Sequence, residues 1–172
     1  MEYVHHYTSP LGGITLASNG EVLTGLWFVG QRHFPESIST QCVERFLPVF
    51  EETCHWLDIY FKGDQPGYTP PFRICSTPFR EAVLRELLTI PYGKTITYGE
   101  IARHLALSSG QPVSAQAVGG AVGHNDISII IPCHRVVGAD GSLIGYAAGL
   151  DKKIRLLQLE GVILGADCRL LK

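Results

Sequence analysis

A stretch rich in proline and glycine divides the chain and limits the folds that it can adopt. Residues 63–78 read GDQPGYTPPFRICSTP, with four prolines and two glycines. Both residue types interrupt helices and strands, so this stretch predicts a linker at about residues 63–76. We therefore expect two domains, residues 1–70 and residues 77–172, each long enough to bury a modest core of its own.

The patterns before the linker predict a β-sheet followed by a helix. YVHHYTS and GITLASNGEVLTGLWFV read as strands, and Asn19-Gly20 within the second predicts a tight hairpin turn. From about Ser39, apolar residues at three- and four-residue spacing predict a helix that stops near Gly63.

Shorter helices are predicted after the linker. Thr77 before Pro78 is a typical helix start, and Thr97 with Glu100 three residues later is the pattern of a capping box. A polar loop then leads to a third helix, SAQAVGGAVG, at residues 114–123. Two short helices joined by a polar turn have the outline of a helix-turn-helix. The predicted fold class is therefore α/β (α+β), with a mainly helical second domain.

The third helix has an unusual composition. Its residues are almost all Ala, Gly or Val, and Gly119 and Gly120 in its middle each cost about 1 kcal/mol relative to alanine. Two explanations stay open. The helix either packs closely against another helix or must approach a flat surface, such as a nucleic-acid groove.

Composition and charge narrow the functional classes. The first residues, MEYVHHYTSP, lack a secretory signal pattern, and no apolar run is long enough to span a membrane, so we expect a soluble, cytoplasmic protein with no membrane partner. Five widely spaced cysteines favour free thiols over a disulfide framework. The net charge is −2, but residues 1–71 hold three Lys/Arg and eight Asp/Glu, whereas residues 72–172 hold eleven and eight. Only the second half is basic enough to meet a polyanion.

One cysteine lies in the apolar segment IIIPCHRVVG, residues 129–138. ISIIIP predicts a buried strand that Pro132 ends, which places Cys133 where the strand stops. Such a cysteine is either a small buried hydrophobe or a nucleophile held in a rigid position.

A carboxylate can complete a nucleophilic site around this cysteine. A helix is predicted over DKKIRLLQLEG with Asp151 as its cap, and Glu160 lies at the edge of its apolar side. A carboxylate there needs a partner, either His134 or Arg135. In a relay of Cys133, His134 and Glu160, the carboxylate fixes the imidazole, which draws the thiol proton through a water molecule.

Five motifs of the chain resemble those of the O6-alkylguanine-DNA alkyltransferases, also called methylated-DNA-protein-cysteine methyltransferases. They are ITYGEIA, AVGGAVGHN, IPCHRVVG, GSLIGYAAGL and LLQLEG, and the resemblance covers about residues 77–162. Residues 1–70 are similar only in layout to the family's variable β/α domain, which is ribonuclease H-like. The resemblance implies repair of double-stranded DNA that is bound through its minor groove. An alkylated guanine is flipped out, and its O6-alkyl group, or the O4-alkyl group of thymine, passes irreversibly to the protein.

The resemblance also implies roles for single residues. Cys133 is expected to accept the alkyl group, His134 to act as its base through water, and Glu160 to orient His134. Asn125 matches the asparagine that braces the active-site turn. Tyr98 matches the tyrosine that crowds the rotated phosphate and donates a proton to guanine N3. Each molecule acts once, because a thioether does not release its alkyl group to water. No cofactor is implied, and we expect a monomer.

Further implied roles concern the base and the DNA. The backbone carbonyls of Cys133 and Val136 accept from the exocyclic amine of guanine, Tyr146 lines the pocket, and the amide of Ala147 donates to O6. The implied DNA contacts lie on the glycine-rich helix and beside the acceptor: Gln116, Ala117, Gly119, Gly120 and Arg135. Gln116 departs from the family, which usually has an arginine there to fill the gap left by the flipped base. Glutamine can hydrogen-bond the orphaned cytosine but brings no charge.

Three alternatives are weighed against this interpretation. An alkyltransferase-like protein that binds lesions without transfer would lack the acceptor, so Cys133 argues against it. A Cys-His hydrolase would turn over repeatedly, but no separate hydrolase signature is visible. The candidate metal ligands in the first domain are His5, His6, Cys42, Cys54 and His55. No pair of them has a recognisable ligand spacing, so we predict no metal.

Overall fold

The computed structural model describes residues 2–36, 38 and 42–171, and the chain forms two compact units. The N-terminal unit comprises the residues up to 75 together with residues 126–130, and the C-terminal unit comprises residues 76–125 and those from 131 onward. The chain therefore returns briefly to its first unit just before Cys133. The sequence analysis placed this short stretch in the second domain.

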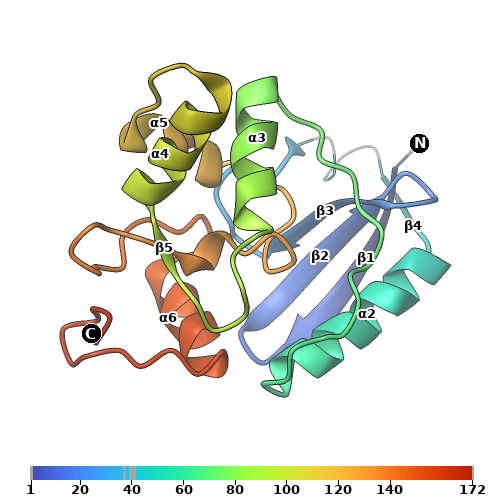
Figure 1. Ribbon diagram of the computed structural model, residues 1–172. Helices are drawn as coiled ribbons and strands as arrows, with labels where there is room; N and C mark the ends of the chain where they lie inside the picture. Colours follow the sequence, from blue (N-terminus) through green and yellow to red (C-terminus); the bar gives the residue numbers. More distant parts are fainter. Residues whose placement is uncertain (1, 37, 39–41, 172) are drawn as a thin grey trace. The chain divides into compact units, whose positions relative to one another are not determined.

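The N-terminal unit contains a four-stranded sheet with the order β3-β2-β1-β4 (Figure 1). Its strands are β1 (Glu2–Ser9), β2 (Gly12–Ser18), β3 (Leu23–Phe28) and β4 (Cys42–Glu44). The first three are antiparallel, and β4 runs parallel to β1. The predicted turn at Asn19-Gly20 is confirmed, because the Asn19 side chain accepts from the backbone amides of Glu21 and Val22 and Gly20 has a φ of +109°.

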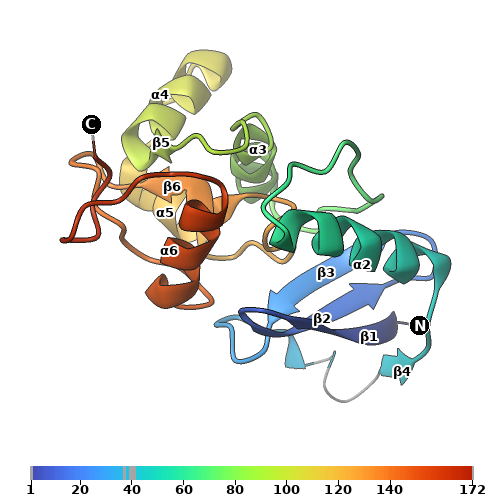
Figure 2. The same ribbon diagram turned by 90° about the horizontal axis from the view of Figure 1, so that it is seen from below.

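Helix α2 (Pro48–Phe61) lies along one face of this sheet (Figure 2). The sequence predicted that this helix starts near Ser39, which lies outside the described residues. Within the described residues this prediction is wrong, because residues 42–44 form β4 and the helix begins only at Pro48. The physical reason is the proline, which fits the first position of a helix but not its interior. The predicted stop near Gly63 is confirmed, and Gly63 has a φ of +88°.

The segment before Cys133 is not the strand that its isoleucines predicted. Ile127 and Ser128 form isolated bridge positions, with Ile127 opposite Leu26, and residues 129–130 form a turn. The amide of Leu26 donates to the carbonyl of Asp126 at 2.8 Å, and the amide of Ser128 donates to the carbonyl of Leu26 at 2.9 Å. Ile129 has a φ of +71°, which no strand contains. The apolar run is explained by burial against β3 rather than by a strand.

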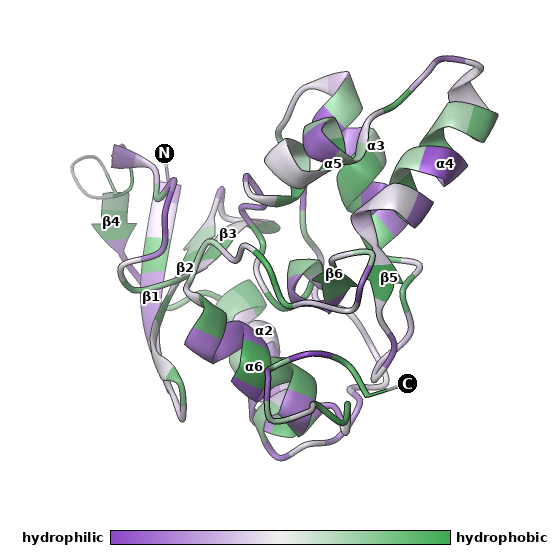
Figure 3. Cartoon of the chain, turned by 90° about the vertical axis from the view of Figure 1, so that its left-hand side faces the viewer, coloured by the Kyte–Doolittle hydropathy of each residue, from purple (hydrophilic) through white to green (hydrophobic). Residues whose placement is uncertain are grey.

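The C-terminal unit is mainly helical. Its elements are α3 (Pro78–Leu87), β5 (Ile96–Thr97), α4 (Tyr98–Ser109), α5 (Ala115–Val122), the 3₁₀ turn η1 (Cys133–Arg135), β6 (Val136–Val137) and α6 (Leu150–Leu159). Hydrophobic and hydrophilic residues alternate along α4 and α6 (Figure 3). Both predicted caps are confirmed: Thr77 accepts from the amide of Arg80, and Thr97 with Glu100 forms a complete capping box. The predicted cap of α6 is wrong, because Gly149 takes that place and Asp151 lies in the first turn.

The parallel pair of β5 and β6 brings two distant parts of the chain together. Ile96 lies opposite Val136, and Thr97 opposite Val137. Because Tyr98 follows β5 directly and η1 precedes β6 directly, this short ladder places Tyr98 near the turn that carries Cys133. No helix among the described residues is long and apolar enough to cross a membrane.

Candidate active site

Cys133 begins the turn η1 and is buried, with 4% of its surface exposed. The Asn125 side chain lies beneath it and donates through Nδ2 to the carbonyl of Ile131 at 2.9 Å and to Cys133 Sγ at 3.1 Å. Asn125 is itself buried. One amide group therefore fixes both the backbone before the thiol and the sulfur, which is the bracing expected from the resemblance.

The next residue, His134, is fully buried and bonds to a carboxylate. Its Nε2 lies 2.6 Å from Oε1 of Glu160, at the C-terminal end of α6. An ionised carboxylate only accepts hydrogen bonds, so Nε2 carries a proton, and Nδ1 is the basic nitrogen of the neutral ring. Burial lowers the pKa of His134, against the opposing effect of Glu160. The ring is therefore neutral at rest and can accept a proton at Nδ1.

Glu160 is held by more than the histidine. Arg135 donates to it through Nε at 2.8 Å and Nη2 at 3.0 Å, and the amide of Gly93 donates at 3.0 Å. Burial alone would raise the pKa of Glu160, but the hydrogen bonds from His134 and Arg135 and the charge of Arg135 outweigh it and bring this pKa to about 2. The carboxylate is ionised at any physiological pH, so it can orient His134 permanently.

Arg135 has a different place from the one expected of a DNA contact. Its side chain is 10% exposed, Nη1 donates to the carbonyl of Ile90 at 2.7 Å, and the other donors face Glu160. The guanidinium also lies 5.7 Å from the ring centre of Tyr92. These contacts use the guanidinium inside the unit, where Arg135 is one of the two partners that the sequence offered for Glu160, rather than toward DNA as the resemblance implied.

Several polar groups surround the sulfur of Cys133. Burial raises the pKa of the thiol, while the hydrogen bond from Asn125 and the charge of Lys153 lower it in part. Burial, followed by the proximity of Cys133, raises the pKa of Tyr98 to about 12, and the same two causes raise the pKa of Tyr146 well above its ordinary value. At rest the site therefore holds a neutral thiol and two protonated phenols.

Tyr98 connects the wall of this site with helix α5. Its hydroxyl donates to the carbonyl of Ile144 at 3.1 Å. A Cβ added to Gly119 would come within 3.8 Å of its ring, which is an ordinary contact, and one added to Gly120 would meet nothing. Packing therefore requires neither of these two glycines, so close helix packing does not explain them. Ala115, Gln116, Ala117 and Gly120 are exposed.

The loop from β6 to α6 supplies other groups predicted for the pocket. Tyr146 and Ala147 are partly exposed, and the hydroxyl oxygen of Tyr146 is buried beside Cys133. Within the described residues the amide of Ala147 makes no hydrogen bond. The carbonyl of Val136 accepts from Lys153 at 2.6 Å, and that of Cys133 accepts from the amide of Val136.

Lys153 is a residue of this site that sequence reasoning missed. It is fully buried in α6, and its Nζ also donates to the carbonyls of Ile144 at 2.9 Å and Gly145 at 3.1 Å. The signal was present, since Lys153 lies three and four residues before Leu156 and Leu157, on the apolar stripe of the helix. A charged residue on such a stripe requires buried partners.

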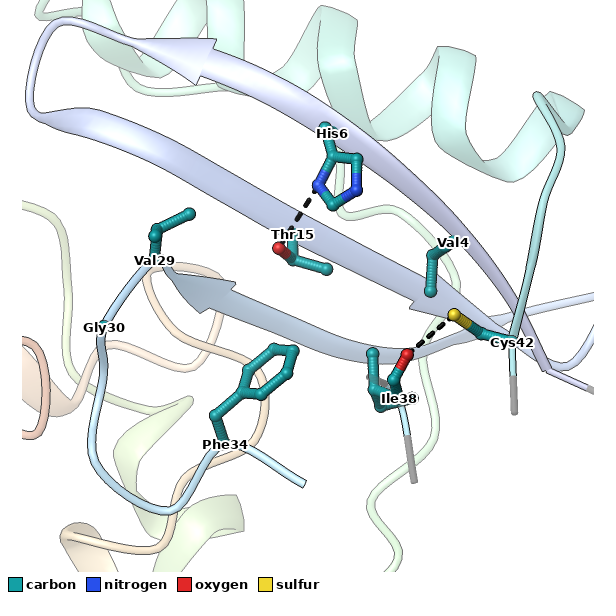
Figure 4. A pocket seen from close by; sticks show the side chains of 8 residues that line it. All are labelled: Val4, His6, Thr15, Val29, Gly30, Phe34, Ile38 and Cys42. Atoms are coloured by element: carbon teal, nitrogen blue, oxygen red, sulfur yellow. Dashed lines mark hydrogen bonds between the residues drawn. The ribbon is translucent and has the colours of Figure 1, made fainter. Parts of the chain in front are cut away.

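The candidate metal ligands of the N-terminal unit are divided between the two faces of its sheet. His5 packs against the rings of Phe46 and Phe50, whereas His6 lies on the opposite face of β1 and contacts Thr15 at 3.4 Å. His6 shares an apolar pocket with Cys42, whose thiol donates to the carbonyl of Ile38 (Figure 4). No group of three potential ligands is found among the described residues. That the protein uses no metal stays a prediction.

Comparison with known proteins covers both units. The family descriptions "6-O-methylguanine DNA methyltransferase, ribonuclease-like domain" and "6-O-methylguanine DNA methyltransferase, DNA binding domain" match residues 3–71 and 78–162. The chain belongs to the 6-O-methylguanine DNA methyltransferase family. This finding confirms the family and the fold class that the sequence predicted.

Relatives of this methyltransferase family extend over most of the chain. The methylated-DNA–protein-cysteine methyltransferase of Mycobacterium leprae is 44% identical over 155 residues, 88% of each chain. That of Haemophilus influenzae is 40% identical over 161 residues, 93% of this chain and 87% of the relative. Among solved structures, Mycobacterium tuberculosis OGT in complex with DNA is similar with a TM-score of 0.80 and 40% identity, covering 92% of each chain.

Proposed function

We propose that this protein repairs DNA by transferring the alkyl group of O6-alkylguanine, and of O4-alkylthymine, to Cys133. The observation that carries the proposal is the buried thiol next to a histidine whose other nitrogen is fixed on an ionised carboxylate, in a member of this methyltransferase family. The 40% identity with an OGT solved in complex with DNA supports DNA as the substrate.

The transfer follows from the protonation states of the site. His134 takes the thiol proton at Nδ1 through a water molecule, and the sulfur attacks the alkyl carbon as the bond from this carbon to O6 breaks. The electron pair of that bond stays on guanine, which receives a proton at N3 from Tyr98. The proton that left the thiol restores the phenol, so the products are a thioether and a neutral guanine. No cofactor is needed, and the thioether ends the activity of that molecule.

The exposed face of α5 is the proposed contact with double-stranded DNA. Gln116, Ala117 and Gly120 are exposed there, and no packing contact explains the missing side chain of Gly120. A helix surface of small residues can approach the floor of a minor groove. Tyr98, whose ring lies beside Gly119, is placed to crowd a phosphate as the alkylated base rotates out. One chain carries every group used here, so a monomer suffices.

An intact-mass measurement tests the proposal. After incubation with duplex DNA that contains O6-methylguanine, each protein molecule should gain the mass of one methyl group in place of a hydrogen. Binding without this gain would favour a lesion-binding protein, and repeated turnover of an ester without a stable adduct would favour a hydrolase. Either result would contradict the proposal.

The hydroxyl of Tyr98 should have a chemical role that its ring does not have. Tyr98→Phe removes the proton donor, so we expect transfer to slow by on the order of 10²-fold while DNA binding changes little. Tyr98→Ala should also weaken binding, because the ring that crowds the phosphate is lost. Single-turnover rates and binding constants for both variants check this. Equal effects of the two substitutions on the transfer rate would contradict a chemical role for the hydroxyl.

Gln116→Arg should accelerate repair of duplex DNA. Flipping a base costs a few kcal/mol of stacking and pairing, and a long cation at this exposed position can fill the gap and contact the phosphates. We expect the repair rate to rise on the order of tenfold at low salt, with a smaller gain at high salt because added ions screen the charge. The free base O6-benzylguanine needs no flipping and serves as the control. An equal acceleration with the free base would place Gln116 in the pocket instead.

A further inference from the structure

The buried charges around the thiol do not balance. Among the described residues, the buried charged side chains are Arg135, Lys153 and Glu160, so two cations accompany one carboxylate. Arg135 is bonded to Glu160 at 2.8 and 3.0 Å. No carboxylate in the described chain lies within ion-pair distance of Lys153. Because a buried charge without a partner is costly, the leftover cation needs an explanation.

The hydrogen bonds of Lys153 show that it carries a proton. Its Nζ donates to three carbonyls, those of Val136, Ile144 and Gly145, at 2.6, 2.9 and 3.1 Å. A neutral amine has only two N–H groups, whereas an ammonium has three. Burial lowers the pKa of Lys153 to about 8, which still leaves it mostly protonated at neutral pH.

Cys133 is the group that can supply the missing negative charge. The other titratable groups near its sulfur are excluded: burial keeps the phenols of Tyr98 and Tyr146 protonated, and Glu160 is already neutralised by Arg135. The charge of Lys153 favours the ionised form of Cys133, and an ionised Cys133 in turn favours the protonated lysine. Both lie in the C-terminal unit, and the carbonyl of Val136 that binds Lys153 follows directly after η1.

We propose that Lys153 is the counter-ion that stabilises the Cys133 thiolate during alkyl transfer. This inference rests on the proposed function, in which Cys133 is the acceptor. Once the thiol proton has passed to His134, Arg135 and the imidazolium share the carboxylate of Glu160, and the Cys133 thiolate is the anion left for Lys153. As the sulfur forms its bond to the alkyl carbon, the negative charge passes to the departing guanine, which is then protonated. The lysine charge therefore acts on the sulfur itself.

A purely structural role for Lys153 makes a different prediction. The lysine also links β6 to the loop at residues 144–145, and the carbonyl of Ile144 accepts from Tyr98 as well. If this link were its only task, its loss would deform the pocket and lower the transfer rate at every pH. A counter-ion instead sets the pH at which the thiolate forms.

The test measures the ionisation of Cys133 directly. Ultraviolet thiolate absorbance is followed against pH in the full chain without DNA, and the signal of Cys133 is isolated by subtracting the same protein with Cys133→Ala. In Lys153→Met we expect the midpoint to rise by about one pH unit or more, which is about a tenfold smaller thiolate fraction at neutral pH. Lys153→Gln keeps two N–H donors for the carbonyls but has no charge, so we expect the same rise of the midpoint. This variant replaces Lys153→Met in the experiment if the methionine variant does not fold.

Transfer rates and control variants complete the experiment. In the neutral variants, the pH profile of the transfer rate with O6-benzylguanine should shift by the same amount as the midpoint of the thiolate absorbance. At high pH the transfer rate of these variants should return to within about twofold of the wild-type value. Lys153→Arg keeps the charge and should leave the midpoint near that of the wild type. The matched control is Lys152→Met, which removes a charge that lies 3.9 Å from Asp151 and should change nothing. An unchanged midpoint in the neutral variants would overturn the proposal, and so would a lowered rate at all pH values. Since the absorbance requires no alkyl donor, it gives its answer even if Cys133 accepted no alkyl group.

Discussion

Replacing Cys133 with alanine is expected to abolish methyl transfer while lesion binding remains. The substitution removes one buried sulfur, and Asn125 keeps its hydrogen bond of 2.9 Å to Ile131 after losing the one to the thiol. The cost in stability should therefore be small, about 1 kcal/mol. The proposed groove contacts of α5 involve other residues, so affinity for O6-methylguanine DNA should change little.

Intact mass and a binding assay on the same samples check this result. The matched control is Cys75→Ala, which removes an exposed thiol near the boundary of the two units and should leave methyl uptake unchanged. A methyl group gained by Cys133→Ala would show that another residue is the acceptor. A complete loss of lesion binding would show that the sulfur shapes the pocket as well as reacting in it.

The local structures that were predicted correctly are stabilised by hydrogen bonds between residues that lie close together in the sequence. Thr97 and Glu100 satisfy each other's backbone within a single helical turn, so their capping box is visible in four consecutive residues. The turn at Asn19-Gly20 is equally local. The bond between His134 and Glu160 was anticipated across 26 residues because a carboxylate at the edge of an apolar helix face needs a partner.

The sequence-based predictions were wrong or incomplete where contacts between distant parts of the chain determine the local structure. The isoleucines of residues 127–131 fit a strand by their composition, but only Ile127 pairs with β3, as a single bridge, and a turn follows it. The positive φ of Ile129 within this turn cannot be inferred from a branched residue. Lys153 was missed because its partners are three backbone carbonyls from two other segments. Every residue has a backbone carbonyl, so the sequence does not indicate which of them accept a hydrogen bond. The resemblance implied a DNA contact for Arg135, whereas the sequence also offered this residue as a partner of Glu160, and its bond to the carbonyl of Ile90 depends on the fold.

Glu160→Gln should have the largest effect on stability of the substitutions considered. Its carboxylate accepts from His134, Arg135 and Gly93 at 2.6 to 3.0 Å, and its side chain is fully buried. The glutamine amide has the same shape but no charge, so the Arg135 guanidinium is left buried without a counter-charge. The NH2 group of the amide also faces N–H donors where the carboxylate had an accepting oxygen. Removing one partner of a buried ion pair costs about 3 to 5 kcal/mol. Urea unfolding measures this loss, and transfer should slow because His134 is no longer fixed in its tautomer.

The pH dependence of this loss identifies its cause. The pKa of Glu160 is about 2 in the folded protein against 4.5 as its ordinary value, so the folded state binds the proton less readily, and the contribution is complete above about pH 5. As the pH falls from about 5 toward 2 the contribution is lost, and the difference in unfolding free energy between the wild type and Glu160→Gln should shrink. The control is Glu81→Gln in the exposed pair with Arg85, 2.6 Å apart, which should cost no more than about 0.5 kcal/mol. A difference that stayed constant from pH 7 to pH 3 would mean that packing, rather than the buried charge of Glu160, stabilises the turn that carries Cys133.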